Sequence, residues 1–187
     1  MSTKTRLIQI VIIFTLDAVG QNLNPFFSAL IGIGLIAWYW HCFDFGGLTI
    51  KQAYLIISAI AAFVVFEIII KPLIPVTSNQ TSLTALTPFA MFSDTCILAP
   101  AAEELIFRYF AFAEDDTRWS KILNWIIVPL VFAFFHIRGT ANLIAILPYL
   151  TISYIFTYLR YKYQLSASYT AHVLNNFVAL VVALIVH

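Results

Sequence analysis

The chain has 187 residues, of which 61% are hydrophobic and only 10% are charged, and its formal net charge is +1. A soluble domain of this length would expose far more charge, and a nearly neutral chain offers no basic surface for nucleic acid. We therefore predict a polytopic membrane protein, with residues 1–187 forming a single transmembrane domain and no nucleic-acid partner.

Seven hydrophobic segments predict an all-α fold, a membrane helix bundle of about seven transmembrane helices. Long stretches without charge can supply the roughly 20 apolar residues that a spanning helix needs. The segments are 6–22, 26–43, 52–71, 86–112, 119–138, 141–160 and 166–187. The first is short and contains Asp17, so the sequence leaves open whether it crosses the membrane or lies in the interface.

The basic residues predict an orientation in the membrane. With a cytoplasmic amino terminus, most Lys and Arg side chains would lie inside, which satisfies the positive-inside rule. The inner residues would be Lys4, Arg6, Lys51, Arg118, Lys121, Arg160 and Lys162, and the outer ones Lys71 and Arg138. We expect an integral protein of a bacterial plasma membrane, in contact with lipid, with its carboxyl terminus outside.

Four prolines fall inside the predicted spans. Each removes one backbone hydrogen bond and tends to kink its helix. The residues are Pro88, Pro100, Pro129 and Pro148. Pro100 lies three residues before Glu103 and could loosen the helix there, although an ordinary membrane-helix proline explains it equally well.

A concentration of charge stands out in Glu103-Glu104-Leu-Ile-Phe-Arg108. One charge at mid-bilayer costs roughly 2.5–3.5 kcal/mol, so such groups are expected to be paired and shielded by protein. Glu104 and Arg108 are four residues apart in the favourable acid-first order and can pair along one helix face. Glu103 points about 100° away, which leaves it free to face a cavity.

Two further patterns have helical spacing. Phe132 and His136 share one helix face, and His172 and Asn176 share another. Taken singly, such a His is more often an interfacial residue, and an Asn in a span often bonds a neighbouring helix. Three more acids lie in predicted spans without any pattern: Asp17, Glu67 and Asp94.

Together these groups suit hydrolysis of an amide by water. A shielded carboxylate such as Glu103 can act as a general base, and imidazoles can polarise a carbonyl or bind an oxyanion. Glu103, His136 and His172 also match the ligand set of many sites for a divalent metal such as zinc, and a mechanism without metal is equally open. Cys42 and Cys96 form no CxxC pair, so we expect neither a disulfide nor a zinc–thiolate site.

The ordered motifs EExxxR, FxxxH and HxxxN resemble those of the CPBP intramembrane proteases. That family includes type II CAAX prenyl endopeptidases and bacteriocin-processing or immunity proteins. The resemblance covers about residues 95–180. It implies that Glu103 activates water, that Glu104 and Arg108 position it, and that His136 assists the water or holds a metal.

The resemblance further implies that His172 and Asn176 stabilise the oxyanion. One departure is Tyr109, since relatives commonly have Gly after the motif arginine, which puts the geometry of the substrate groove in doubt. On straight helices, Glu103 would lie roughly 15 Å deep, His172 roughly 9 Å and His136 roughly 25 Å along its span. Convergence requires the fifth span to begin later, or to tilt and kink at a proline.

These observations favour an intramembrane endopeptidase that acts on a membrane-associated peptide or protein. The alternative is a non-catalytic bacteriocin immunity or binding protein of the same fold. A small transporter would instead depend on Glu67 or Asp94 along an ion path. The substrate, its prenylation and the oligomeric state stay open.

Overall fold

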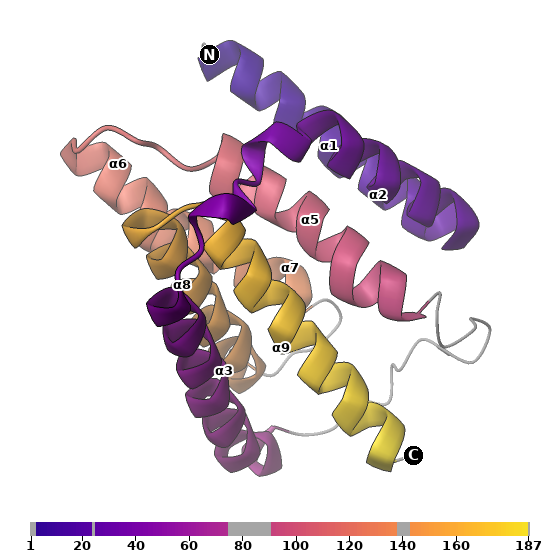
Figure 1. The fold of residues 1–187 in the computed structure, drawn as a ribbon, viewed down its shortest axis with the longest axis vertical. Helices are drawn as coiled ribbons and strands as arrows, with labels where there is room; N and C mark the ends of the chain where they lie inside the picture. The colour runs from indigo at the N-terminus through magenta and orange to yellow at the C-terminus, as the bar shows by residue number, and fades with distance from the viewer. Residues whose placement is uncertain (1–2, 24, 75–90, 138–142, 187) are drawn as a thin grey trace.

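The computed structural model describes residues 3–23, 25–74, 91–137 and 143–186, and these residues form helices and short connections (Figure 1). The predicted all-α fold is confirmed for them. The α-helices are α1 (Thr3–Leu23), α2 (Pro25–Tyr39), α3 (Ile50–Ile70), α5 (Ala99–Glu104), α6 (Arg118–Ile122), α7 (Val128–His136), α8 (Ile146–Lys162) and α9 (Leu165–Val186).

Three of these helices are continued by π-helical turns. Helix α5 lies between η5 (Ser93–Leu98) and η6 (Leu105–Phe110), and η7 (Leu123–Ile127) joins α6 to α7. A described helix overlaps each of the seven predicted hydrophobic segments, of which residues 86–90, 138, 141–142 and 187 lie outside the described residues. Three stretches are long and apolar enough to span a membrane: Ile50–Ile70, Arg118–His136 and Leu165–Ile185. The protein is accordingly an integral membrane protein.

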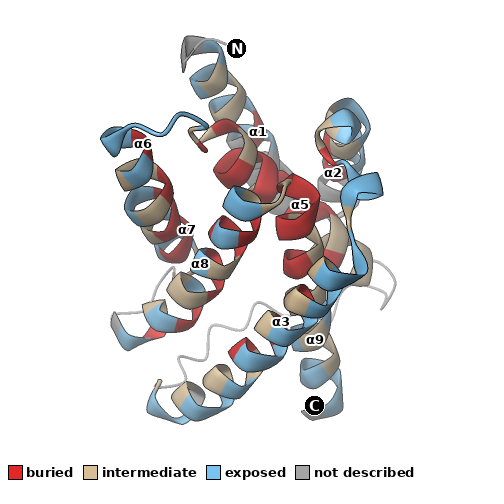
Figure 2. Ribbon diagram, turned by 60° about the vertical axis from the view of Figure 1, so that its left-hand side comes forward, coloured by how far each residue is buried: buried red, intermediate tan, exposed pale blue. Residues whose placement is uncertain are grey.

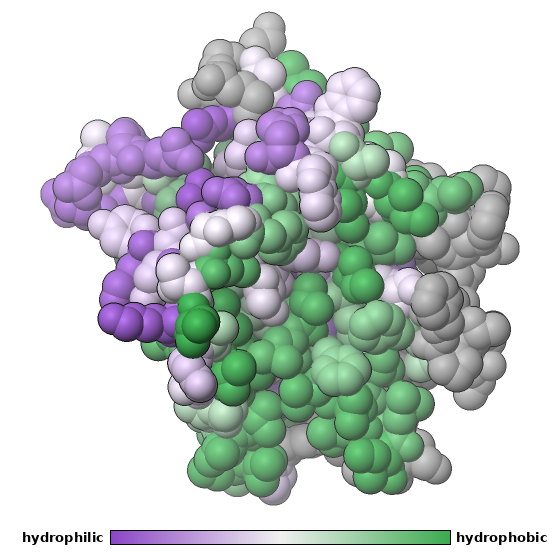
Figure 3. Space-filling view, in the orientation of Figure 1, coloured by the Kyte–Doolittle hydropathy of each residue, from purple (hydrophilic) through white to green (hydrophobic). Residues whose placement is uncertain are grey.

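The helix formed by η5, α5 and η6 occupies the centre of the bundle. It contacts α1, α2 and α9, and Figure 2 shows the densest group of buried residues around α5. Figure 3 shows apolar side chains over the lower part of the molecule and hydrophilic ones gathered toward the upper left. A buried polar group on α5, such as Glu104, is therefore held away from water and must find its partners within the protein.

A proline follows each of the π-helical turns η5 and η7. Pro100 and Pro129 lie in the first turns of α5 and α7. A proline ring clashes with the carbonyl four residues earlier, which belongs to Cys96 in η5 and to Trp125 in η7. Each π-helical turn ends two residues before its proline, whose ring nitrogen cannot donate to that carbonyl. The two prolines therefore coincide with departures from regular α-helix, and the kinks expected at them stay a prediction.

Helix α2 approaches η5 closely at Gly32. A Cβ at this position would lie 2.7 Å from the Cβ of Leu98, whereas no described atom lies within 4 Å of a Cβ at Gly34. Glycine at residue 32 thus permits a contact that any side chain would push apart.

We expect Gly32→Ala to lower the free energy of unfolding by about 1–3 kcal/mol relative to Gly34→Ala, through overpacking. The comparison isolates the close approach, because both changes raise helix propensity equally. Denaturant titration in mixed micelles measures the difference. Equal stability of the two variants would contradict the tight contact at Leu98.

Candidate active site

Glu103 and Glu104 form the end of α5, between η5 and η6. Neighbouring residues on a helix point about 100° apart, so the two carboxylates face different surroundings. The side chain of Glu104 is fully buried, whereas that of Glu103 is 24% exposed. One carboxylate is therefore part of the protein interior and the other can meet a substrate.

The Glu104 carboxylate contacts donors from two helices. Its Oε1 lies 3.5 Å from Nη1 of Arg108 and 3.0 Å from Nδ1 of His172. Its Oε2 accepts a hydrogen bond of 2.5 Å from the hydroxyl of Ser168. The predicted pairing of Glu104 with Arg108 is present, and α9 supplies the other partners.

The Arg108 guanidinium is fully buried among aromatic rings. Its central carbon lies 4.3 Å from the ring centre of Phe132 and 5.5 Å from that of Phe156. Its Nη2 donates to the hydroxyl of Ser153 across 2.7 Å and to the carbonyl of the same residue across 3.3 Å. Cation–π contacts and the serine compensate part of the cost of removing this charge from water.

Glu103 faces both motif histidines. Its Oε2 lies 3.5 Å from Nε2 of His136 and 3.6 Å from Nε2 of His172. Both separations exceed an ordinary hydrogen bond, and within the described part of the chain Oε2 of Glu103 has no hydrogen-bond partner. Oε2 is thus a buried acceptor that no donor among the described residues satisfies, the kind of atom for which a bound water is one explanation.

In each histidine, Nδ1, the ring nitrogen remote from Glu103, contacts a hydrogen-bond acceptor. Nδ1 of His136 lies 2.8 Å from the carbonyl oxygen of Phe132, and Nδ1 of His172 contacts Glu104. Carbonyl and carboxylate oxygens only accept, so both Nδ1 atoms carry the proton. In the neutral rings, Nε2 therefore presents a lone pair toward Glu103, and in the charged rings it presents an N–H.

Aromatic rings hold both imidazoles in place. His136 lies between Phe132, at 4.3 Å between ring centres, and Tyr149, at 5.1 Å. His172 stacks on Phe156 with 4.4 Å between centres and an angle of 26°. These contacts restrict rotation of the rings, which keeps Nε2 of each directed at Glu103.

Asn176 has a different contact. Its Nδ2 donates to the carbonyl of Thr95 across 2.9 Å and its Oδ1 accepts from Asn175 across 3.2 Å. This bond ties α9 to the π-helical turn η5. The role of Asn176 in stabilising an oxyanion stays a prediction.

Residues 85–178, half of the chain, match the profile of the Rce1-like family, described as type II CAAX prenyl endopeptidase Rce1-like. The chain belongs to this family. Its matched range contains every residue that the motifs predict for the site. No curated protein and no solved structure matches the chain.

Two serines of this Rce1-like site escaped sequence reasoning. Ser168 lies four residues before His172, so the spacing that pairs Glu104 with Arg108 could have indicated it. Ser153 lies on α8 without any such relation, and nothing in the sequence distinguishes it from other hydroxyls in apolar segments.

The remaining residues that the sequence raised contribute little to the site. Cys42 and Cys96 are both free. Tyr109 packs against Phe110, with 4.8 Å between ring centres, and contributes to the core. The side chain of Asp17 lies outside the described residues.

The metal hypothesis is tested by the arrangement of the donors. The part of the chain that the structure describes contains no group of three or more His, Cys, Asp or Glu side chains that could hold a metal ion. Whether Glu103, His136 and His172 hold a metal stays a prediction, and no catalytic step is derived through one.

Proposed function

We propose that this protein is an intramembrane endopeptidase that hydrolyses a peptide bond of a membrane-associated peptide or protein. One observation carries the proposal: a buried carboxylate oxygen of Glu103 lies without a hydrogen-bond partner among the described residues, within 3.6 Å of two imidazole nitrogens. A water at this position would contact the base that activates it. Membership of a family of type II CAAX prenyl endopeptidases supports the same reaction.

In the proposed reaction, Glu103 accepts a proton from water while the water oxygen attacks the scissile carbonyl carbon. The C–O bond forms, the carbonyl oxygen becomes an oxyanion, and the C–N bond then breaks. The proton on Glu103 passes to the leaving amine, so the carboxylate is regenerated. Nε2 of neutral His136 or His172 would accept the second hydrogen of the water and so orient it, and Glu104 would hold the N–H at Nδ1 of His172.

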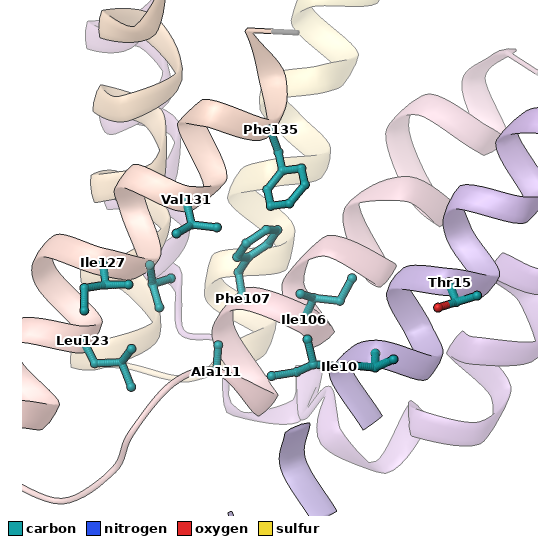
Figure 4. Close-up of a pocket in the computed structure, with 11 residues that line it drawn as sticks. Ile10, Thr15, Ile106, Phe107, Ala111, Leu123, Ile127, Val131 and Phe135 are labelled. Carbon is teal, nitrogen blue, oxygen red and sulfur yellow. The ribbon is translucent and has the colours of Figure 1, made fainter. Parts of the chain in front are cut away.

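An apolar cavity lined by helices that also carry site residues fits a substrate that arrives through lipid. It has a volume of about 340 Å³ and lies between α1 and the η7–α7 helix, over η6. Phe107 and Phe135 project toward each other within it (Figure 4). Phe107 lies one helical turn after Glu103, and Phe135 directly precedes His136. Such a cavity would bind an apolar part of the substrate.

The proposal includes about seven membrane spans with the amino terminus inside. In Figure 1, the start of α1, the α2–α3 connection, the end of η6 and the α8–α9 connection lie toward the upper left. The carboxyl ends of α3 and α9 lie toward the bottom of the same view. Alternation of this kind supports the orientation inferred from basic residues. A bacterial plasma membrane remains part of the proposal.

Comparison of protein termini in cells tests the function without knowledge of the substrate. We expect new amino termini in membrane-associated proteins of cells that express the protein and none in cells that express Glu103→Gln. Identical termini in both would contradict the proposal. A biological effect retained by Glu103→Gln would instead favour the non-catalytic immunity or binding protein.

A mechanism in which Glu103 alone activates the water leads to a second expectation, on metal removal. Treatment with 1,10-phenanthroline should leave kcat unchanged, because activation of water rests on Glu103 and needs no Lewis acid. Hydrolysis of a prenylated CAAX peptide, which the family description makes the first probe, measures it. Activity that falls and returns with added zinc would contradict the metal-free mechanism.

A further inference from the structure

We propose that Ser168 is a positioning residue of the active site, which holds Glu104 so that His172 keeps its proton on Nδ1 and its Nε2 lone pair toward Glu103. For its effect on turnover this inference rests on the proposed function, whereas its effect on His172 does not. Ser168 belongs to none of the three sequence motifs, and it is fully buried.

Two side chains on one face of α9 contact the two carboxylate oxygens of Glu104, and we call this pair of contacts the Glu104 clamp. Ser168 and His172 are four residues apart on α9 and therefore neighbours. The hydroxyl of Ser168 donates to Oε2 of Glu104 across 2.5 Å, and Nδ1 of His172 contacts Oε1 across 3.0 Å. Two donors on the two oxygens fix the rotation of the carboxylate, which is otherwise a soft torsion.

The clamp is needed because the guanidinium of Arg108 attracts the same carboxylate of Glu104. Its Nη1 lies 3.5 Å from Oε1 of Glu104, and neither Nη1 nor Nε has a hydrogen-bond partner among the described residues. A buried guanidinium with unsatisfied donors attracts the carboxylate strongly. Without the serine, Glu104 is free to rotate toward Arg108 and away from Nδ1 of His172. The imidazole proton would then no longer be held on the side remote from Glu103.

The tautomer of His172 is a direct test. In protein with ¹⁵N-labelled histidine, at a pH at which the ring is neutral, we expect Nδ1 to show the protonated signal and Nε2 the unprotonated one. In Ser168→Ala, part or all of the population should shift to the Nε2–H form. Ser166→Ala is the matched control, because Ser166 is also buried on α9 but donates to the carbonyl of Asp44. An unchanged tautomer in Ser168→Ala would overturn the proposal.

Turnover provides the second test. On a prenylated CAAX peptide, Ser168→Ala should lower kcat about 10- to 100-fold, the usual cost of losing a partner that orients a functional group, with KM unchanged. Ser168→Cys, which keeps a weaker donor, should have an intermediate kcat, and Ser166→Ala should match the wild type. Equal kcat for Ser168→Ala and Ser166→Ala would overturn the role in turnover.

The two tests separate this inference from the proposed function. A wild-type protein that hydrolyses no peptide would contradict the protease, and the tautomer measurement would still decide the role of Ser168. If Ser168→Ala does not fold, Ser168→Cys takes its place in both measurements. If Ser168→Cys has both the tautomer of His172 and the kcat of the wild type, the proposal is contradicted. A shift of the tautomer toward the Nε2–H form, or a lower kcat, supports it.

Discussion

Replacing Glu103 by glutamine is expected to lower kcat about 100- to 10,000-fold, the range that loss of a general base produces. Glutamine keeps the shape of the side chain but cannot accept a proton from water. The fold should be preserved, because Oε2 of Glu103 has no hydrogen-bond partner among the described residues to lose. The rate of hydrolysis of a prenylated CAAX peptide, with the unfolding midpoint measured in parallel, tests both expectations.

Asp116→Asn is a suitable control for the Glu103 experiment. It makes the same change from carboxylate to amide at a side chain that is 80% exposed and pairs with Lys121 at the surface. Exposed pairs of this kind contribute little, so its kcat should equal that of the wild type. A Glu103→Gln variant as active as Asp116→Asn would eliminate Glu103 as the base.

The second large effect concerns stability. Glu104→Ala should lower the free energy of unfolding by about 3–5 kcal/mol, the usual cost of removing one partner of a buried ion pair. The change leaves the fully buried Arg108 with Ser153 and aromatic rings as its remaining partners. Denaturant titration in mixed micelles measures the loss, which should far exceed that of Glu103→Gln.

A double variant separates the charge from the contact. Glu104→Gln with Arg108→Met removes both charges at similar volume, which is often neutral for stability. We expect it to regain most of the stability that Glu104→Ala loses, while kcat stays low because His172 has lost its carboxylate partner. A double variant no more stable than Glu104→Ala would show that the charges are not the cause.

Local spacing made much of the site predictable. The intervals between Glu104 and Arg108, Phe132 and His136, and His172 and Asn176 each follow one helical turn, and a helix of known period converts spacing directly into shared faces. The helices themselves follow from long apolar segments. Both arguments use only neighbours in sequence.

The convergence of His136 with Glu103 could not be derived in this way. Depth estimates on straight helices separated these residues, yet His136 Nε2 lies 3.5 Å from Glu103 Oε2. The helix begins at Arg118, and η7 with Pro129 changes its register before the histidine. The sequence does not state how a helix will accommodate a proline, because tertiary packing selects among kink, bulge and wide turn.

The position of ordered water is the most direct measurement of the central claim. In a density map that resolves solvent, the account predicts a water about 2.6–3.2 Å from Oε2 of Glu103 and in contact with Nε2 of His136 or His172. A carboxylate of Glu103 that turns toward lipid, or that binds a protein donor in place of water, would contradict it.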